Sequence, residues 1–127
     1  MSKLKNPEVL LIIFLIILSV AHFAYYYNNG LGLAYNDARS HLNISRRVVE
    51  GLKPGLAQLG SVWLPLPHVL DALTVWNDFM WHSGLAGALI SMISYVLTGY
   101  LIYLFLKDLK VSMLGRIIGL VVYALNG

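Results

Sequence analysis

The chain alternates between long apolar stretches and one long mixed segment. Residues 9–27 (VLLIIFLIILSVAHFAYYY) and 84–106 (GLAGALISMISYVLTGYLIYLFL) contain no Asp, Glu, Lys or Arg. A helix of about 20 apolar residues crosses the ~30 Å hydrocarbon core of a bilayer. The pattern therefore predicts transmembrane helices over 9–27 and 84–106.

A cleaved signal peptide is the rival interpretation of the first stretch. MSKLK is a basic start, and Ser19-Val20-Ala21 has the small-x-small form of a cleavage site. The apolar character continues into the aromatic cluster FAYYY (23–27), however, and such clusters are typical of a membrane interface. This continuation favours a transmembrane helix.

A third apolar run begins at residue 117, after a polar connection over 107–116. It continues to residue 127, and eleven helical residues cover about half of the hydrocarbon thickness. We therefore expect 117–127 to be the start of a third span, and the chain to be either a fragment of a longer membrane protein or an unusually short product.

The segment 28–83 predicts two amphipathic helices that lie along the membrane surface. In 37–50, Ala38, Leu42, Ser45 and Val49 recur at helical spacing, Asn36 can cap the start and Gly51 can end the helix. The second helix, 67–80, starts at a proline and carries an apolar face that includes Trp76, with Trp81 just beyond it as a further interface residue. The predicted fold class is an all-α integral membrane protein with two full spans, a partial third and these two juxtamembrane helices in an outer loop.

Basic residues next to the spans predict the orientation. Lys3 and Lys5 precede the first span, and Lys107, Lys110 and Arg116 follow the second. Cytoplasmic flanks are enriched in Lys and Arg. We therefore expect a multi-pass protein with a cytoplasmic N-terminus and an extracytoplasmic loop over 28–83.

Composition narrows the function classes. Only 12% of residues are charged, against about 25% in soluble domains. The chain has no cysteine, which excludes disulfides, thiolate metal sites and cysteine nucleophiles within it. The net charge of +3 comes from scattered residues without a basic run, so nucleic acid is not an expected partner.

Residues 34–51, AYNDARSHLNISRRVVEG, concentrate the candidate chemistry. Asp37 and His41 are one helical turn apart and project from the same side. A carboxylate can accept a proton from a hydroxyl, and His41, Arg46 or Arg47 can bind a phosphate. The other interpretation is that Asp37 only stabilises the helix start, and that the arginines contact lipid headgroups.

Three residues outside this segment have simpler interpretations. His22 lies near the outer end of the first span, which favours an interfacial position over a functional one. For His68 and Trp63, packing at the turn before the second surface helix is favoured over a role in the site.

The order of these features resembles the N-terminal part of GT-C glycosyltransferases, in the branch that includes protein O-mannosyltransferases and aminoarabinose transferases. An apolar span is followed by an outer loop with an Asp that opens a helix, then by a proline-rich apolar segment and a second span. The matching residues are Asp37, His41, Ser45-Arg46, Glu50-Gly51 and Leu64-Pro65-Leu66-Pro67. The chain departs from many relatives at Ala38, where they have Glu, so a metal site of paired carboxylates is not expected from the motif.

The resemblance implies transfer of a sugar, such as a mannose-like hexose, from a polyprenyl-phosphate carrier to a protein or glycan acceptor on the outer face. It implies that Asp37 is the catalytic carboxylate. The leaving phosphate of such a reaction needs cations, which His41, Arg46 or Arg47 can supply as substrate-binding residues. The resemblance does not establish a cofactor. A divalent metal ion is a candidate. Membrane lipid is a further expected partner.

Two other hypotheses belong to different classes. A small non-enzymatic membrane protein would use the outer loop to bind a partner or anionic lipid. A transporter fragment would need polar or charged residues inside the spans, which hold only His22 and scattered Ser and Thr.

Overall fold

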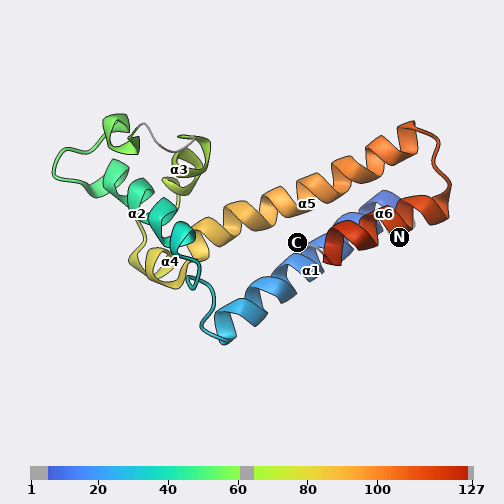
Figure 1. Ribbon diagram of the computed structural model, residues 1–127, viewed down its shortest axis with the longest axis horizontal. Helices are drawn as coiled ribbons and strands as arrows, with labels where there is room; N and C mark the ends of the chain where they lie inside the picture. Colours follow the sequence, from blue (N-terminus) through green and yellow to red (C-terminus); the bar gives the residue numbers. More distant parts are fainter. Residues whose placement is uncertain (1–5, 61–64, 126–127) are drawn as a thin grey trace. The chain divides into compact units, whose positions relative to one another are not determined.

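The computed structural model describes residues 6–60 and 65–125, and all regular structure in those ranges is helical. The chain divides into two compact units: Met1–His22 with Met92–Gly127, and Phe23–Ser91 (Figure 1). The predicted all-α class is confirmed for the described residues.

Two helices are long and apolar enough to cross a membrane: α1 (Pro7–Asn28) and α5 (Leu85–Asp108). α1 begins two residues before the predicted range 9–27 and ends one residue after it. α5 begins one residue after the predicted start at Gly84 and ends two residues after the predicted end at 106. Only 11% of the most apolar 18-residue stretch of each helix is buried within the protein. The core helix of a soluble domain would instead be largely covered.

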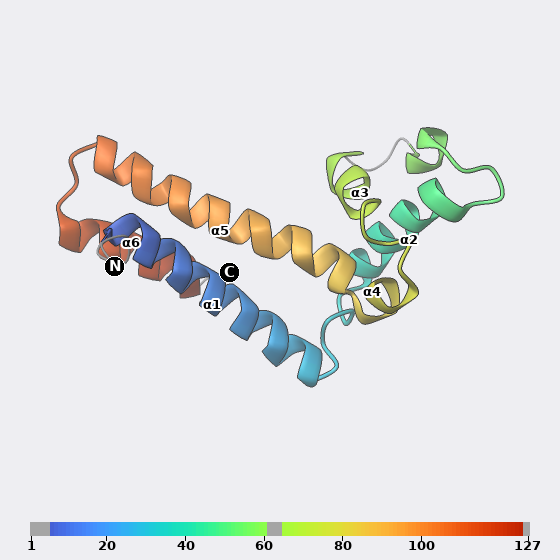
Figure 2. The ribbon, with the colours of Figure 1, turned by 180° about the vertical axis from the view of Figure 1, so that it is seen from behind.

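The first unit contains α1 up to His22, α5 from Met92, and α6 (Met113–Leu125). Lys107 Nζ lies 2.7 Å from Glu8 Oε1, so the beginning of α1 and the end of α5 lie together. A Cβ atom on Gly99 would lie 2.8 Å from Leu15 Cδ1 and 3.1 Å from Tyr123 Cε1. Glycine at this position therefore allows α5 to approach both α1 and α6 closely. Figure 2 shows the ribbons of α1, α5 and α6 from behind.

Side chains of the first unit also satisfy polar groups between helices. The Tyr123 hydroxyl donates to the carbonyl oxygen of Tyr95 at 2.8 Å, and the Tyr95 hydroxyl donates to Ala124. His22 contacts the edge of the Tyr95 ring, with the ring centroids 6.2 Å apart. His22 thus packs against an aromatic side chain of α5.

The third apolar helix begins earlier than predicted. α5 continues to Asp108 and α6 starts at Met113, so the polar connection expected over 107–116 is reduced to a short turn that includes Lys110 with φ of 56°. The 13 residues of α6 correspond to about 20 Å, less than the ~30 Å of a hydrocarbon core. A third membrane crossing stays a prediction.

The second unit contains α2 (Asn36–Glu50), the 3-10 helix η2 (Leu56–Leu59), α3 (Pro65–Asp71) and α4 (Asp78–Ser83). α2 begins one residue before the predicted range 37–50. Its N-cap is Tyr35, which makes no side-chain cap, so the prediction that Asn36 caps this helix was wrong. Asp37 in the first turn and Arg47 in the last turn both suit the helix dipole.

The single helix predicted over 67–80 is wrong, because the structure has two short helices there. α3 ends at Asp71, and the Asn77 side chain accepts a hydrogen bond from the backbone N–H of Met80 to cap a new helix. Between them, the Thr74 hydroxyl donates to the Asp71 carbonyl, and the Val75 carbonyl accepts from Arg46. Side chains thus take over backbone partners that a continuous helix would use.

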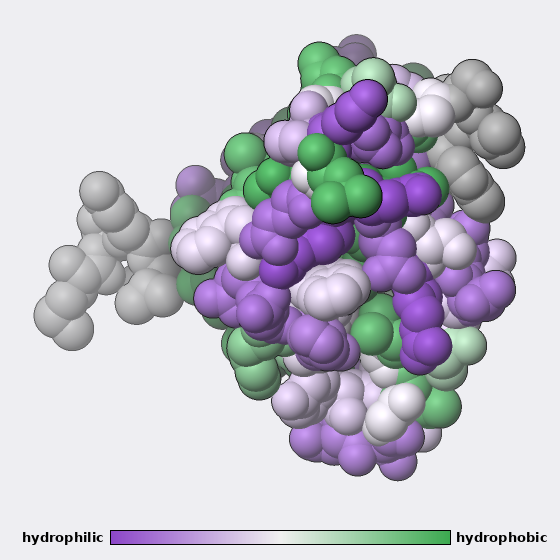
Figure 3. Space-filling model, turned by 90° about the vertical axis from the view of Figure 1, so that its left-hand side faces the viewer, coloured by the Kyte–Doolittle hydropathy of each residue, from purple (hydrophilic) through white to green (hydrophobic). Residues whose placement is uncertain are grey.

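The core of the second unit fixes α2 against the start of α5. Leu42, Val75 and Ala86 are buried together, with Trp81 packed against them. Gly84 ends α4 in the left-handed conformation (φ 79°), and α5 starts at the next residue. Away from this core, much of the face shown in Figure 3 is hydrophilic.

Candidate functional site

A cleft of about 370 Å³ opens in the second unit, and most of its lining is apolar. Its polar lining residues are Tyr35, Asp37, His41, Asp71 and Ser91, contributed by α2, α3, α5 and the segment before α2. None of the described lining residues is a lysine or an arginine. The cleft therefore offers carboxylates and an imidazole without an opposing strong cation.

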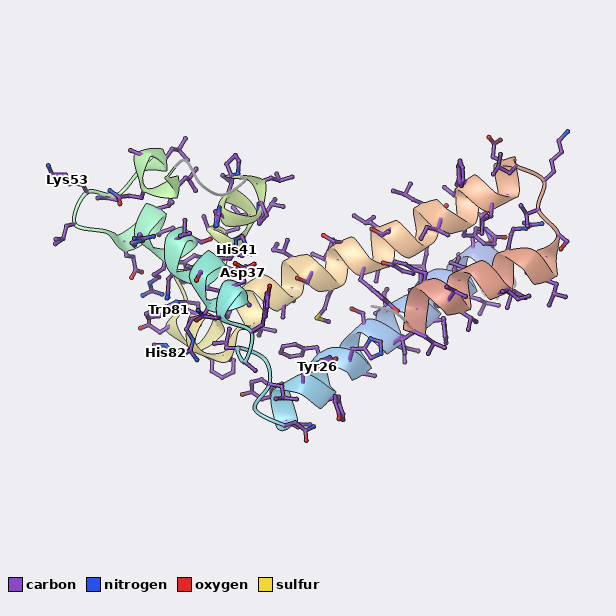
Figure 4. All side chains as sticks on the ribbon, in the orientation of Figure 1. Tyr26, Asp37, His41, Lys53, Trp81 and His82 are labelled. Carbon is purple, nitrogen blue, oxygen red and sulfur yellow. The ribbon has the colours of Figure 1, made fainter. Side chains whose placement is uncertain are left out.

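Asp37 and His41 lie beside each other on α2, as their spacing predicts. His41 Nε2 is 3.5 Å from Asp37 Oδ2, and both side chains are partly exposed to the cleft (Figure 4). Two residues four positions apart on a helix are neighbours on its surface. The sequence thus predicted this pair correctly, although the catalytic role of Asp37 stays a prediction.

His68 extends the pair into the interior. Its Nε2 lies 2.8 Å from His41 Nδ1, and the two rings stack with centroids 4.7 Å apart. His68 is fully buried, and the sequence favoured packing at a turn over a role in the site. The structure therefore shows a chain of contacts from Asp37 through His41 to His68.

Asp71 lies one turn after His68 on α3 and lines the same cleft. It is only 4% exposed, and this burial raises the pKa of its carboxyl, an effect that the nearby charge of His41 partly opposes. Sequence reasoning missed Asp71. A usable signal was present, because His68-x-x-Asp71 places an imidazole and a carboxylate on one helical face, as Asp37-x-x-x-His41 does.

Replacing Asp71 by Asn should raise the thermal unfolding temperature at pH 7.5. Because burial raises the Asp71 pKa above its ordinary value of 3.8, the folded state keeps a proton that the unfolded chain releases, and stability falls as the pH rises through this range. Asn cannot ionise, so Asp71→Asn should gain a few degrees, since ~1 kcal/mol shifts the midpoint of a small domain by roughly 4–8 °C.

The check is thermal unfolding of the purified protein at several pH values. The gain should shrink towards pH 4, and Asp108→Asn, which changes an exposed carboxylate, should show no comparable gain. A gain for Asp71→Asn that is equal at pH 4 and pH 7.5 would contradict the burial argument.

Arg46 lies away from the cleft and joins α2 to the following segments. Its Nη1 donates to the Val75 carbonyl and its Nη2 to Asp78 Oδ1, each at 2.5 Å, and it also pairs with Glu50. The guanidinium carbon lies 4.8 Å from the centroid of the Trp81 ring. These contacts occupy the guanidinium in structural roles, and binding of substrate by Arg46 stays a prediction.

Arg47 has a different environment. It is exposed and lines a shallow groove of mixed polar and apolar character, together with Ser40, Asn43, Ile44, Arg46 and Trp81. Among the residues that the structure describes, no side-chain hydrogen bond or ion pair joins Arg47 to another group. Trp81 donates from Nε1 to Asn43 Oδ1 on α2, and its position at a membrane interface stays a prediction.

The structure does not extend to every residue of the motif. Trp63, Leu64, Lys3 and Lys5 lie outside the described residues, as does Gly127. In the described ranges, no group of three or more His, Cys, Asp or Glu side chains is arranged to hold a metal ion. The involvement of a divalent metal ion stays a prediction.

Comparison of the chain with family models, curated proteins and solved structures finds no match. The geometry of the two apolar helices and the cleft must therefore support any functional conclusion, together with the motif resemblance.

Proposed function

We propose that this chain is the N-terminal part of an integral membrane glycosyltransferase. The full enzyme would transfer a sugar, such as a mannose-like hexose, from a polyprenyl-phosphate carrier to a hydroxyl of a protein, lipid or glycan acceptor. The exposed apolar surfaces of α1 and α5 support membrane integration, because the bilayer would cover them. The motif resemblance supports the type of reaction.

The observation that carries the enzymatic part is the cleft that contains Asp37, His41 and Asp71. In the proposed reaction, Asp37 takes the proton of the acceptor hydroxyl as its oxygen attacks the anomeric carbon of the sugar. The bond between that carbon and the carrier phosphate oxygen breaks, and the phosphate leaves with the bonding electrons. A positioned base of this kind contributes about 10²–10⁴-fold to a rate.

The charge of the cleft suggests that it receives the acceptor and not the carrier phosphate. Among the described residues, its lining has two carboxylates and no lysine or arginine, and like charges this close repel a phosphate. We propose that cations elsewhere bind the phosphate, with exposed Arg47 or later parts of the full enzyme as the source.

We propose that the cleft faces the extracytoplasmic side, as the distribution of Lys and Arg predicts. The absence of cysteine allows single-cysteine labelling without background. In sealed right-side-out vesicles, a membrane-impermeant maleimide should label Lys53→Cys in the second unit, and should label Asp108→Cys only after permeabilisation. Both positions are exposed, and the reverse labelling pattern would refute this orientation.

The enzymatic proposal is tested with the full-length protein in proteoliposomes. Polyprenyl-phosphate carrying a tritiated hexose is supplied with membrane extract as the source of acceptors. Protein-dependent movement of the label from the lipid phase to an acceptor is expected. Label that stays on the carrier at the level of protein-free liposomes, for each hexose tested, would argue for the non-enzymatic alternative.

A further inference from the structure

The second imidazole of the site, His68, does not reach the cleft lining but touches a residue that does. His41 lines the cleft and lies 3.5 Å from the Asp37 carboxylate, while His68 contacts the opposite nitrogen of the His41 ring at 2.8 Å. We propose that His68 is a positioning residue that fixes the tautomer of His41, and thereby keeps Asp37 ready to accept a proton. This inference rests on the proposed catalytic role of Asp37.

The argument starts from the two nitrogens of His41. A neutral imidazole carries a proton on one ring nitrogen and a lone pair on the other. If Nε2 carries the proton, it can donate to Asp37 Oδ2, and Nδ1 must then accept from the N–H at His68 Nε2. If the proton is on Nδ1, the Nε2 lone pair faces the carboxylate, which is repulsive unless Asp37 is protonated.

Both contacts of the His41 ring are satisfied together only in the first of these states. In that state a proton on His68 Nε2 donates to His41 Nδ1, and the His41 proton lies on Nε2, on the side of the Asp37 carboxylate. Asp37 in its ionised form then faces an N–H of His41 at a nitrogen–oxygen distance of 3.5 Å, and this is the form that can take a proton from an acceptor hydroxyl. Asp37 from α2 lies beside His41 Nε2, and the charge of His41 acts on the Asp71 carboxyl from α3.

The surroundings of His68 suit a residue whose orientation is fixed. It is fully buried on α3, its ring stacks on His41 at an interplanar angle of 29°, and Asp71 follows one turn later. Burial restricts the ring to one rotamer, so its N–H keeps a constant direction. His68 therefore acts through His41, without contact to the substrate.

The test compares three variants of the full-length enzyme in the hexose-transfer assay. A Gln amide places an N–H donor near the position of His Nε2, an Asn amide places it near Nδ1, and Phe keeps only the stacked ring. We expect His68→Phe and His68→Asn to lower kcat about 10- to 100-fold, the range found for residues that orient an active side chain, with little change in KM for the carrier. His68→Gln should recover most of the rate.

A spectroscopic readout makes the test independent of activity. In full-length protein with ¹⁵N-labelled histidine, NMR should show His41 protonated at Nε2 and bare at Nδ1, and His68→Asn should shift this balance towards Nδ1. An unchanged His41 tautomer in His68→Asn, or equal rates in the Gln and Asn variants, would overturn the proposal.

The two proposals fail in different ways. If Asp37→Asn transfers hexose at the wild-type rate, the proposed function of Asp37 is wrong and the positioning role falls with it. If Asp37→Asn is inactive while all three His68 variants keep the wild-type kcat, only the role of His68 is wrong.

Discussion

Asp37→Asn is expected to reduce hexose transfer by about 10²–10⁴-fold, the usual contribution of a general base. The amide cannot take the proton of the acceptor hydroxyl at neutral pH. It is nearly the same size as the carboxylate, and its oxygen can still accept from His41 Nε2, 3.5 Å away in the native site. The loss should therefore appear in kcat and not in folding or membrane insertion.

The measurement is steady-state transfer in proteoliposomes with equal amounts of inserted protein. Asp108→Asn is the matched control, because it makes the same chemical change at an exposed carboxylate in the first unit. It should leave transfer unchanged. Transfer by Asp37→Asn within a factor of two of wild type would remove Asp37 from the catalytic role.

Arg46→Lys is expected to destabilise the second unit by about 2–3 kcal/mol, which is below the 3–5 kcal/mol for breaking a fully buried ion pair. The Arg46 side chain is 15% exposed. Its guanidinium donates a hydrogen bond to the Val75 carbonyl and forms ion pairs with Asp78 and Glu50. A lysine ammonium has one nitrogen and lacks the planar fork that bonds two acceptors in fixed geometry. At least one of these partners would therefore lose its contact.

Arg47→Lys is the control. It makes the same chemical change at the next residue of the same helix, where the side chain is exposed. Thermal unfolding of the purified protein, followed by tryptophan fluorescence, should report the difference, since Trp81 packs against the Arg46 guanidinium. Equal unfolding temperatures for the two variants would contradict the structural role of Arg46.

The parts of the fold that follow from local sequence were predictable. The length of the two apolar stretches is enough to predict α1 and α5, because a charge-free run of this length has few other stable forms. Helical periodicity gives α2, and with it the contact between Asp37 and His41.

The break between α3 and α4 could not be predicted from periodicity, because its cause is a tertiary contact. Arg46 donates a hydrogen bond to the carbonyl oxygen of Val75, which lies 29 positions later in the sequence. The Asn77 cap then starts a new helix. Such a contact overrides an apolar pattern that a continuous helix would satisfy equally well.

The contact between His68 and His41 could not be predicted for the same reason, because it is also a tertiary contact. His68 meets His41 across 27 positions, and this approach depends on how α3 packs on α2. The spacing of His68 and Asp71 was visible in the sequence, but nothing local showed that they share a cleft with Asp37. Arg46 and Arg47 are likewise adjacent in sequence, yet only the folded chain separates the engaged guanidinium from the exposed one.

The most direct test of the central claim is a single-turnover experiment that separates chemistry from binding. Full-length enzyme is first saturated with tritiated polyprenyl-phosphate hexose in proteoliposomes, and acceptor extract is then added by rapid mixing. Wild type and Asp37→Asn should bind the same amount of carrier, while the rate of label transfer falls at least 100-fold in the variant. Equal transfer rates at equal carrier occupancy would contradict the assignment of Asp37 as the base of a lipid-linked sugar transferase.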